Sequence, residues 1–355
     1  MSKIKLLYIF SKSRDFKHAK KYPPSIFYGY YQFSRNSDFK VTLLEPQKKN
    51  LLWLLWRPFE LYFYSKTGIG FKLYQILASL KLINSQDIVI AVNDSIGIPL
   101  AILKKLRLVK PKIVFISAGL INNLEINKKH WVFKFYRWLL KGVDLILCWS
   151  PFEEKLYKSL IKAKAKFIPL EPDIDFFKPD YKMPLENFIL SIGKDIGRDF
   201  KTLFEAVEKL KIPTKVITNR INIKNLEIPD NVELHLEHIN YSTLIKWYKK
   251  ARVVVINIKE IHRFSGQRAL LEALSMGKTI IAAKTKSLTT TYNPKNGKEI
   301  VFYQPSNSQN LRNKINSIYN NPEKIKKIGL QARKFAEKMP KNLFYKNLKN
   351  FILKL

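Results

Sequence analysis

Hydrophobic residues along this chain gather in short continuous runs rich in Ile, Val, Leu and Phe, and segments of helical periodicity separate these runs. Continuous runs of this kind are typical of strands buried on both faces of a parallel sheet. In the first half the predicted strands are 3–10, 39–45, 87–92, 112–118 and 143–150, with predicted helices that include 98–108 and 130–142.

The second half repeats this alternation after a proline- and acid-rich stretch, 166–180, which we interpret as a linker between domains. Alternating strands and helices predict an α/β protein with two doubly wound, Rossmann-like domains facing a central cleft. The predicted strands are 187–193, 214–219, 232–238, 252–258, 279–285 and 299–304, the predicted helices are 199–211, 241–251 and 266–277, and two closing helices occupy about 307 to 355.

Composition excludes some classes of protein but does not identify the function. The chain has 355 residues, a single cysteine and a net charge of +36 from 64 Lys and Arg against 28 Asp and Glu. One cysteine leaves no intramolecular disulfide, and no apolar stretch is long enough to span a membrane, so we expect a cytoplasmic protein. The charge favours an anionic membrane surface over nucleic acid, since no nucleic-acid module is recognisable. Compositional drift is an alternative origin of the charge.

The first chemical signal is SGQRALLEALSMGKTIIAA, residues 265–283, in which a glycine-bearing turn opens a helix. Gly266 permits close backbone approach, and the first N–H groups of the helix can meet a diphosphate. Glu272 lies among apolar residues, where a carboxylate can accept hydrogen bonds from ribose hydroxyls. An ordinary amphipathic helix with a solvated glutamate is the competing interpretation.

The second signal is SIGKDIGRDFKTLFEAVEKL, residues 191–210. A strand ends near Gly193, and the loop that follows carries Lys194 and Arg198 before the next helix. Cations at the carboxyl end of a strand are placed to bind a diphosphate and to stabilise the negative charge that develops on it as it leaves. A solvated basic loop is the alternative.

Both segments resemble the retaining GT-B glycosyltransferases often called glycosyltransferase group 1, and the likeness extends over about residues 85–340. The stretch KFIPLEPDIDFFKP is similar to the inter-domain turn of that family, with matches at Asp175, Phe177 and Pro179. The resemblance implies an acceptor domain at 1–170 and a nucleotide-sugar-binding domain at 171–335. It also implies that 336–355 forms a helix that crosses back to the first domain.

The resemblance also implies roles for single residues. Lys194 and Arg198 match the two cations of the family, and Glu272 matches the second of its two glutamates, which holds the ribose. The first glutamate is replaced by Phe264. The predicted donor-binding residues are Gly193, Lys194, Arg198, Asn219, His238, Ile239, Ser265, Gly266, Gln267 and Glu272, of which Lys194, Arg198 and Glu272 are the predicted catalytic residues.

The acceptor half departs further from the family. Its usual histidine would fall near Ala118 and is missing, and the glycine-rich loop expected after the first strand is replaced by SKSRDFKHAKKYPPS. The candidates on the acceptor side are therefore Asn93, Asp94, Ser117 and Gly119, with His130 as a further possibility.

Two other features carry open alternatives. Asp173 and Asp175 have the spacing of a metal-binding pair, but their place in the linker favours a structural use, and the resemblance implies that no metal or other cofactor is needed. Residues 50–82 combine Trp, Tyr and Phe with cations, which suits a membrane interface as well as a pair of core-facing helices.

These observations predict an enzyme that transfers a sugar, with retention, from a UDP- or GDP-sugar to a hydroxyl of a glycan or lipid-linked acceptor. Peripheral attachment to the cytoplasmic face of a membrane is a further expectation. Two alternatives stay open: a sugar-nucleotide epimerase, and a non-enzymatic basic protein that binds a membrane or nucleic acid on a degenerate GT-B scaffold.

Overall fold

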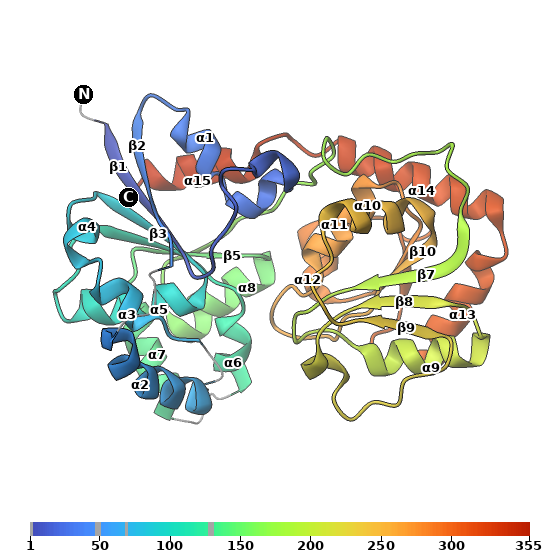
Figure 1. The fold of residues 1–355 in the computed structure, drawn as a ribbon, viewed down its shortest axis with the longest axis horizontal. Coiled ribbons are helices and arrows are strands. Elements are labelled where there is room, and N and C mark those ends of the chain that lie inside the picture. The colour runs from blue at the N-terminus through green and yellow to red at the C-terminus, as the bar shows by residue number, and fades with distance from the viewer. Residues whose placement is uncertain (1–2, 47–50, 68–69, 127–130) are drawn as a thin grey trace. The chain divides into compact units, whose positions relative to one another are not determined.

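The computed structural model describes residues 3–46, 51–67, 70–126 and 131–355 and divides the chain into two compact units. Unit 1 comprises residues 1–17, 27–169 and 344–355, and unit 2 comprises residues 18–26 and 170–343. Each unit is built on a six-stranded sheet whose strand pairs are all parallel (Figure 1). The predicted class, two Rossmann-like α/β units, is confirmed.

In unit 1 the strand order is β2-β1-β3-β4-β5-β6. The strands are β1 (Ile4–Phe10), β2 (Phe39–Leu44), β3 (Ile88–Val92), β4 (Lys112–Ile116), β5 (Leu145–Cys148) and β6 (Ala165–Phe167). The helices are α1 (Tyr30–Ser34), α2 (Leu51–Thr67), α3 (Leu73–Leu77), α4 (Leu80–Asn84), α5 (Asp94–Lys105), α6 (Leu120–Ile126), α7 (Trp131–Leu140), α8 (Pro151–Leu156) and α15 (Leu343–Ile352).

The apolar runs of unit 1 become its central strands because helices cover both faces of the sheet. Every residue of β3 is buried. Helices α1 and α15 lie on one face, and α3 and α5 lie on the other (Figure 1). The aromatic ring of Tyr345 on α15 lies 4.8 Å from that of Phe33, and its hydroxyl accepts a hydrogen bond of 2.8 Å from Asn36. The last helix of the chain therefore packs within unit 1.

In unit 2 the strand order is β12-β11-β10-β7-β8-β9. The strands are β7 (Glu186–Ile192), β8 (Thr214–Ile217), β9 (Val232–His235), β10 (Ala251–Ile256), β11 (Ile280–Ala283) and β12 (Val301–Tyr303). The helices are α9 (Phe200–Leu210), α10 (Tyr241–Lys250), α11 (Gln267–Ser275), α12 (Lys286–Thr291), α13 (Ser308–Tyr319) and α14 (Pro322–Glu337).

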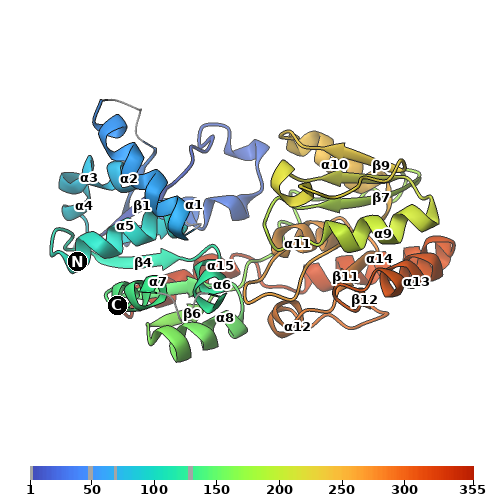
Figure 2. The same cartoon turned by 90° about the horizontal axis from the view of Figure 1, so that it is seen from below.

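The order of the strands reverses direction between β7 and β10, so loops that follow these two strands diverge at the carboxyl edge of the sheet. Ligands of doubly wound sheets bind at such a switch point. Helices α10, α11 and α14 lie on one face, and α9 lies on the other (Figures 1 and 2). Side chains cap the starts of several helices; Asp199, for example, accepts a hydrogen bond from Thr202 N at the start of α9.

Three details differ from the prediction. The closing region forms three helices, α13, α14 and α15, where two were expected, because Pro322 starts a new helix and residues 338–342 separate α14 from α15. The predicted linker begins too early, since 165–167 pairs with β5 as a short edge strand. In the described part of the chain, no helix combines the length and the apolar character that crossing a membrane requires.

Candidate functional site

Loops at the carboxyl edge of the unit 2 sheet bring together most of the predicted donor-binding residues. The loop after β7 carries Gly193 to Asp199, and the loop after β10 leads to Gly266 at the start of α11. An antiparallel bridge between Arg198 and Ile258 holds the two loops together. Because β7 and β10 are neighbours in the sheet, their loops meet where the strand order reverses.

Arg198 lies at the centre of this meeting point. Its side chain is buried, and its Nε donates a 2.9 Å hydrogen bond to Asp195 Oδ2. Its Nη1 is also buried and has no hydrogen-bond partner among the residues that the structure describes. A buried guanidinium nitrogen without a partner is costly, because the donor has lost its hydration without compensation. The group is therefore placed to receive an acceptor from outside the chain.

Two glycines make room for this guanidinium. A Cβ at Gly193 would lie 1.8 Å from Arg198 Nε, and a Cβ at Gly266 would lie 3.2 Å from Arg198 Nη1. Gly266 is also the N-cap of α11 with φ +74°, in the left-handed region that glycine adopts most easily. The unpaired nitrogen of Arg198 therefore lies beside the N-terminus of α11, where backbone N–H groups favour an anion.

Asp195 fixes this arrangement. It accepts hydrogen bonds from Gly197 N at 3.2 Å, from Arg198 Nε, and from Ser265 Oγ in the loop before α11. Burial acts to raise the pKa of Asp195, but the charges of Arg198 and Arg263 outweigh it and hold the pKa below its ordinary value. The carboxylate therefore stays ionised and keeps the guanidinium in one orientation.

Lys194 is directed to a third loop. Its Nζ donates a 3.0 Å hydrogen bond to Glu237 O, which follows β9, and its own carbonyl accepts a 2.6 Å hydrogen bond from Asn219 Nδ2. His238, exposed, and Ile239, half-buried, come next in the same loop. Lys194 thus brings the loop of His238 and Ile239 to the same edge of the sheet as Arg198.

Gln267 and Phe264 pack around Tyr292. Gln267 Nε2 donates a 2.8 Å hydrogen bond to Tyr292 Oη, which donates in turn to Leu170 O at 2.9 Å. The buried ring of Phe264 lies 5.8 Å from the ring of Tyr292. The position at which the resembled family has its first glutamate is thus part of an apolar contact. The buried amide of Gln267 therefore ties the first residue of α11 to Tyr292.

Glu272, on the second turn of α11, is half-buried, and its Oε2 accepts a 3.0 Å hydrogen bond from Tyr248 Oη. Burial raises the pKa of Glu272 to about 7, while the Tyr248 hydrogen bond and the charges of Arg268 and Arg198 act in the opposite direction. Glu272 lines a small pocket together with Ser25, Asp173 and Arg268. It is therefore a carboxyl group with access to a cavity and a proton that is released near neutral pH.

The residues Asp173 and Asp175 serve different partners. Asp173 Oδ1 accepts a 3.0 Å hydrogen bond from Ser25 N, and the exposed Asp175 pairs with Lys341 at 3.0 Å. Ser25 belongs to the segment 18–26, which the contacts assign to unit 2 although it precedes most of unit 1 in the chain. Sequence reasoning missed this segment, because nothing in SKSRDFKHAKKYPPS indicates the unit on which it packs.

Sequence reasoning also missed two buried polar groups near Arg198. Asn257 Nδ2 and Tyr303 Oη have no hydrogen-bond partner among the described residues, and Asn257 Oδ1 accepts a 2.6 Å hydrogen bond from Ser191. Asn257 directly follows the apolar run of β10, and a polar residue at that position was the signal available. Asp195 had a similar signal, since it is an acid between two cations in a glycine-containing loop.

The candidates on the acceptor side gather at the carboxyl ends of β3 and β4 in unit 1. Asp94 Oδ1 accepts hydrogen bonds of 3.0 Å from Ser117 Oγ and from Ala118 N, and the Ser117 and Tyr157 hydroxyls lie 2.7 Å apart. Asn93 has a φ of +100°, a strained value for a residue with a side chain, and caps α5 through Ser95 N at 3.1 Å. His130 lies outside the described residues.

Gly119 follows Ala118 with a φ of +135°, so the turn after β4 depends on glycine. The four candidates therefore lie at the carboxyl ends of two neighbouring strands, and a hydrogen bond joins two of them, Asp94 and Ser117. Strained backbone at such an edge is a common property of binding sites. The edge is polar and contains one carboxylate, Asp94, whose charge is shared between a hydroxyl and a backbone N–H.

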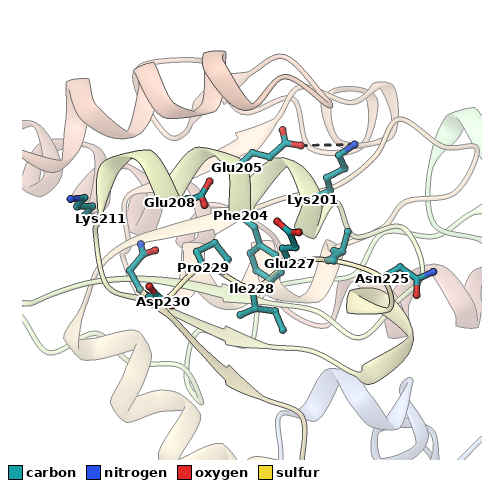
Figure 3. A pocket seen from close by; sticks show the side chains of 12 residues that line it. Lys201, Phe204, Glu205, Glu208, Lys211, Asn225, Glu227, Ile228, Pro229 and Asp230 are labelled. Atoms are coloured by element: carbon teal, nitrogen blue, oxygen red, sulfur yellow. Dashed lines mark ion pairs between the residues drawn. The ribbon is translucent and has the colours of Figure 1, made fainter.

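A separate hollow lies on the outer side of α9. Side chains from the helix and from the loop before β9 line it, among them Glu205, Glu208, Glu227 and Asp230 (Figure 3). Its ion pair joins Lys201 to Glu205 at 3.9 Å. None of the predicted donor-binding residues lines this hollow, and its carboxylates are unsuited to a diphosphate. The hollow is therefore separate from the predicted donor-binding residues.

Comparison with known proteins relates unit 2 to glycosyltransferases. A family model described as "Glycosyl transferase-like" matches residues 198–341, from Arg198 to the end of α14 and just beyond it. No curated protein matches the chain by sequence. The match confirms the resemblance to glycosyltransferases over most of unit 2.

Solved structures match the chain over nearly its whole length. Sucrose-phosphate synthase from Thermosynechococcus elongatus shares 13% identity with a TM-score of 0.72, and 99% of each chain is covered. A glycosyltransferase from Rickettsia africae ESF-5 shares 17% identity, covering 99% of this chain and 98% of that one, with a TM-score of 0.63. Anabaena HepE in complex with UDP and glucose shares 12% identity, covering 99% and 100%, with a TM-score of 0.66. These likenesses establish the GT-B fold.

Proposed function

Starting from a chain with the GT-B fold and a glycosyl transferase-like C-terminal unit, we propose that it transfers a sugar from a nucleotide-sugar donor to an acceptor hydroxyl. The donor is a UDP- or GDP-sugar, and the acceptor is a glycan or a lipid-linked glycan. HepE, which shares the fold, has been solved with UDP-glucose, and this supports a nucleotide sugar as the donor.

The observation that carries the proposal is the unpaired Nη1 of Arg198 beside the N-terminus of α11. A diphosphate oxygen at this point would satisfy the buried guanidinium and would face the free N–H groups of the helix. As the bond between sugar and phosphate breaks, negative charge grows on the diphosphate. A cation that is already in place stabilises this charge without having to reorganise.

The neighbouring residues would complete the donor site. Lys194 would add a second positive charge at the loop that carries His238 and Ile239, which would border the base. Glu272 would accept hydrogen bonds from the ribose. Because two cations and a helix N-terminus supply the positive charge, we propose that the enzyme needs no metal ion. The resemblance to retaining GT-B enzymes supports the further proposal that the transfer retains the anomeric configuration.

A thermal-shift panel tests the donor site. UDP, GDP and ADP are each added to the protein, and the nucleotide that belongs to the donor raises the melting temperature, because it binds the folded state only. Inorganic diphosphate serves as the control for charge alone. Equal shifts with diphosphate and with every nucleotide would mean non-specific anion binding, and the donor site would then be rejected.

Incubation of the preferred donor with and without candidate glycan acceptors distinguishes the remaining functions. A new glycosidic product, with its anomeric configuration read by NMR, supports transfer. An isomerised sugar nucleotide formed without acceptor supports an epimerase. If no nucleotide binds and salt-sensitive binding to nucleic acid is found instead, the chain is a basic binding protein. Unchanged turnover after addition of EDTA supports the metal-free reaction.

We propose, finally, that the enzyme acts in the cytoplasm at the surface of a membrane, where a lipid-linked acceptor is found. The net charge of +36 and the aromatic, cationic segment 50–82 support this placement. Release from a cell lysate at high salt, with the enzyme found in the membrane fraction at low salt, is the expected behaviour. A protein that stays in the supernatant at every salt concentration would argue against it.

A further inference from the structure

Helix α2 exposes an unusual amount of apolar side chain. Leu55 is 68% exposed and Tyr62, seven residues further along the helix, is 57% exposed. Leu54, the residue before Leu55, is also exposed. A helix of a protein that is surrounded by water usually presents polar residues on such a face. The outward side of α2 is therefore rich in exposed apolar side chains, and patches of this kind often mark interaction sites.

Helix α7 extends this apolar face. Trp131 and Trp138 are seven residues apart on one side of the helix and are 54% and 53% exposed. The opposite side of α7 is formed by buried residues such as Phe133 and Tyr136 and packs into the core of unit 1. The tryptophans are therefore outward residues of a well-packed helix, and their exposure does not result from a missing core contact.

A series of ring contacts joins the two helices. The ring of Trp138 lies 6.2 Å from that of Phe135, Phe135 lies 6.4 Å from Phe63, and Phe63 lies 5.1 Å from Phe59 on α2. These contacts place α2 beside α7 in unit 1. We give the name aromatic surface to the exposed apolar residues of these neighbouring helices and of the turn after α5: Leu54, Leu55 and Tyr62 of α2, Trp131 and Trp138 of α7, and Leu106.

The charged groups of this surface are nearly all positive. Lys105 Nζ lies 5.2 Å from the centroid of the Trp138 ring, Lys134 is exposed between the two tryptophans, and Arg107 is exposed beside Leu106. The one acid in the sequence of α2 is Glu60, which is buried and lies 3.7 Å from the cation of Arg57, and the sequence of α7 contains no acid.

We propose that the aromatic surface binds an anionic lipid bilayer, with its rings and leucines at headgroup level and its lysines and arginines against lipid phosphates. Tryptophan and tyrosine favour this interface, and each cation near an anionic surface adds to the attraction. A second copy of the chain would bring the same cations face to face, so charge disfavours self-association. This inference rests on the proposed function, transfer at a membrane surface, and it adds the residues through which the protein binds the membrane.

Co-sedimentation with vesicles tests the surface directly. The full chain is mixed with phosphatidylcholine vesicles that contain or lack phosphatidylglycerol. We expect binding to the anionic vesicles only, weakening as salt is added, because salt screens the charges. The pairs Leu55→Ser with Tyr62→Ser, and Trp131→Ser with Trp138→Ser, should each weaken binding roughly tenfold or more, since each removes two interfacial anchors.

Ile221→Ser is the matched control, because Ile221 is a 74% exposed apolar residue of unit 2 outside the aromatic surface. It should bind vesicles like the wild type. Equal losses in the control and in the double variants, or no binding of the wild type to anionic vesicles, overturn the proposal. So does light scattering that shows a dimer which the double variants dissociate. Nucleotide thermal shifts in the same variants report on the donor site separately, so failure of one proposal is distinguishable from failure of the other.

Discussion

Gly193 and Arg198 approach each other so closely that a single methyl group could not be placed between them. A Cβ at Gly193 would lie 1.8 Å from Nε and 2.1 Å from Cζ of Arg198. The first residue of the loop after β7 therefore leaves the space beside it to the guanidinium of Arg198. The position of the proposed diphosphate therefore depends on Arg198 and also on Gly193, since only glycine leaves room there for the guanidinium.

Gly193→Ala should displace the arginine and remove the response to nucleotide. The clash involves the guanidinium itself, so Arg198 must leave its position beside α11 while the strand can keep its fold. We expect the melting temperature of the free protein to change little and the nucleotide-induced shift to disappear. Gly70→Ala, where a new Cβ would have one contact at 3.4 Å, is the matched control and should keep the shift. An undiminished shift in Gly193→Ala contradicts the site.

Arg198→Ala should lower turnover by roughly 10²–10³, by analogy with the loss of one preorganised hydrogen-bond donor. Arg198→Lys should recover only part of this loss, because an ammonium keeps the charge but cannot pair with Asp195 and a phosphate oxygen in the same plane. Lys201→Ala, an exposed cation of α9, is the control for general charge. Steady-state kinetics with the preferred donor measure all three variants, and equal activity of Arg198→Ala and wild type would refute the assignment.

Glu272 should make nucleotide binding depend on pH. Its pKa is raised by burial to about 7, so the carboxylate that we propose accepts ribose hydroxyls is half protonated near neutral pH. The affinity for the preferred nucleoside diphosphate should therefore rise from about pH 6 to about pH 8 in the wild type. Glu272→Gln cannot ionise, and it should lose this added dependence. Titration of the phosphates is common to both proteins, so the difference between their curves isolates Glu272.

The pH dependence of protein stability provides a second test of the raised pKa of Glu272. In the folded protein the pKa of Glu272 is about 7, whereas the ordinary pKa of a glutamate side chain is 4.5. Between these values the folded state binds more protons than the unfolded state, so the contribution of Glu272 to the free energy of unfolding falls as pH rises, and it is constant above the window. Glu272→Gln should flatten this decline in melting temperature. A pH profile identical to that of the wild type would show that the pKa is not raised.

Much of the fold follows from the sequence because its pattern is local. Strands such as β3 and β10 are continuous apolar runs, and Gly266 and Asp199 stand where α11 and α9 begin. The sequence also indicates a diphosphate-binding role for Arg198 and for the start of α11, each from its own local motif and from the resemblance, but it does not indicate that β7 and β10 are neighbours. The hydrophobic pattern of the sequence indicates the period of each helix or strand and therefore which loops follow the carboxyl ends of strands.

The remaining features depend on contacts between distant parts of the chain. The segment 18–26 packs with unit 2 through the bond from Ser25 to Asp173, and no periodicity encodes this. Strand β6 has only three residues and no apolar run, so the sequence pattern does not distinguish most of it from the linker that follows. The partner of Lys194 is a backbone oxygen, Glu237 O, which any residue at that position would have supplied. Sequence patterns cannot indicate a partner of that kind.

The acceptor side can be tested apart from the donor side. Asp94 is the carboxylate of the polar edge of unit 1, and its Oδ1 accepts from Ser117 Oγ and Ala118 N. Asp94→Asn keeps an oxygen that can accept both bonds but removes the negative charge. If an acceptor hydroxyl binds at this edge, the charged oxygen is its strongest hydrogen-bond acceptor. We expect transfer to the acceptor to fall at least about tenfold, with KM for the acceptor raised.

The nucleotide-induced thermal shift separates this effect from damage to the fold. Asp94→Asn should leave that shift unchanged, because every proposed donor contact lies in unit 2. Ser95→Ala is the matched control, since its hydroxyl donates to Asn93 at the same edge without bearing charge. Transfer that is equally reduced in both variants would indicate that the turn was disturbed. Transfer that is unchanged in Asp94→Asn would remove Asp94 from the acceptor site and leave Ser117 and Gly119 as the groups to test there.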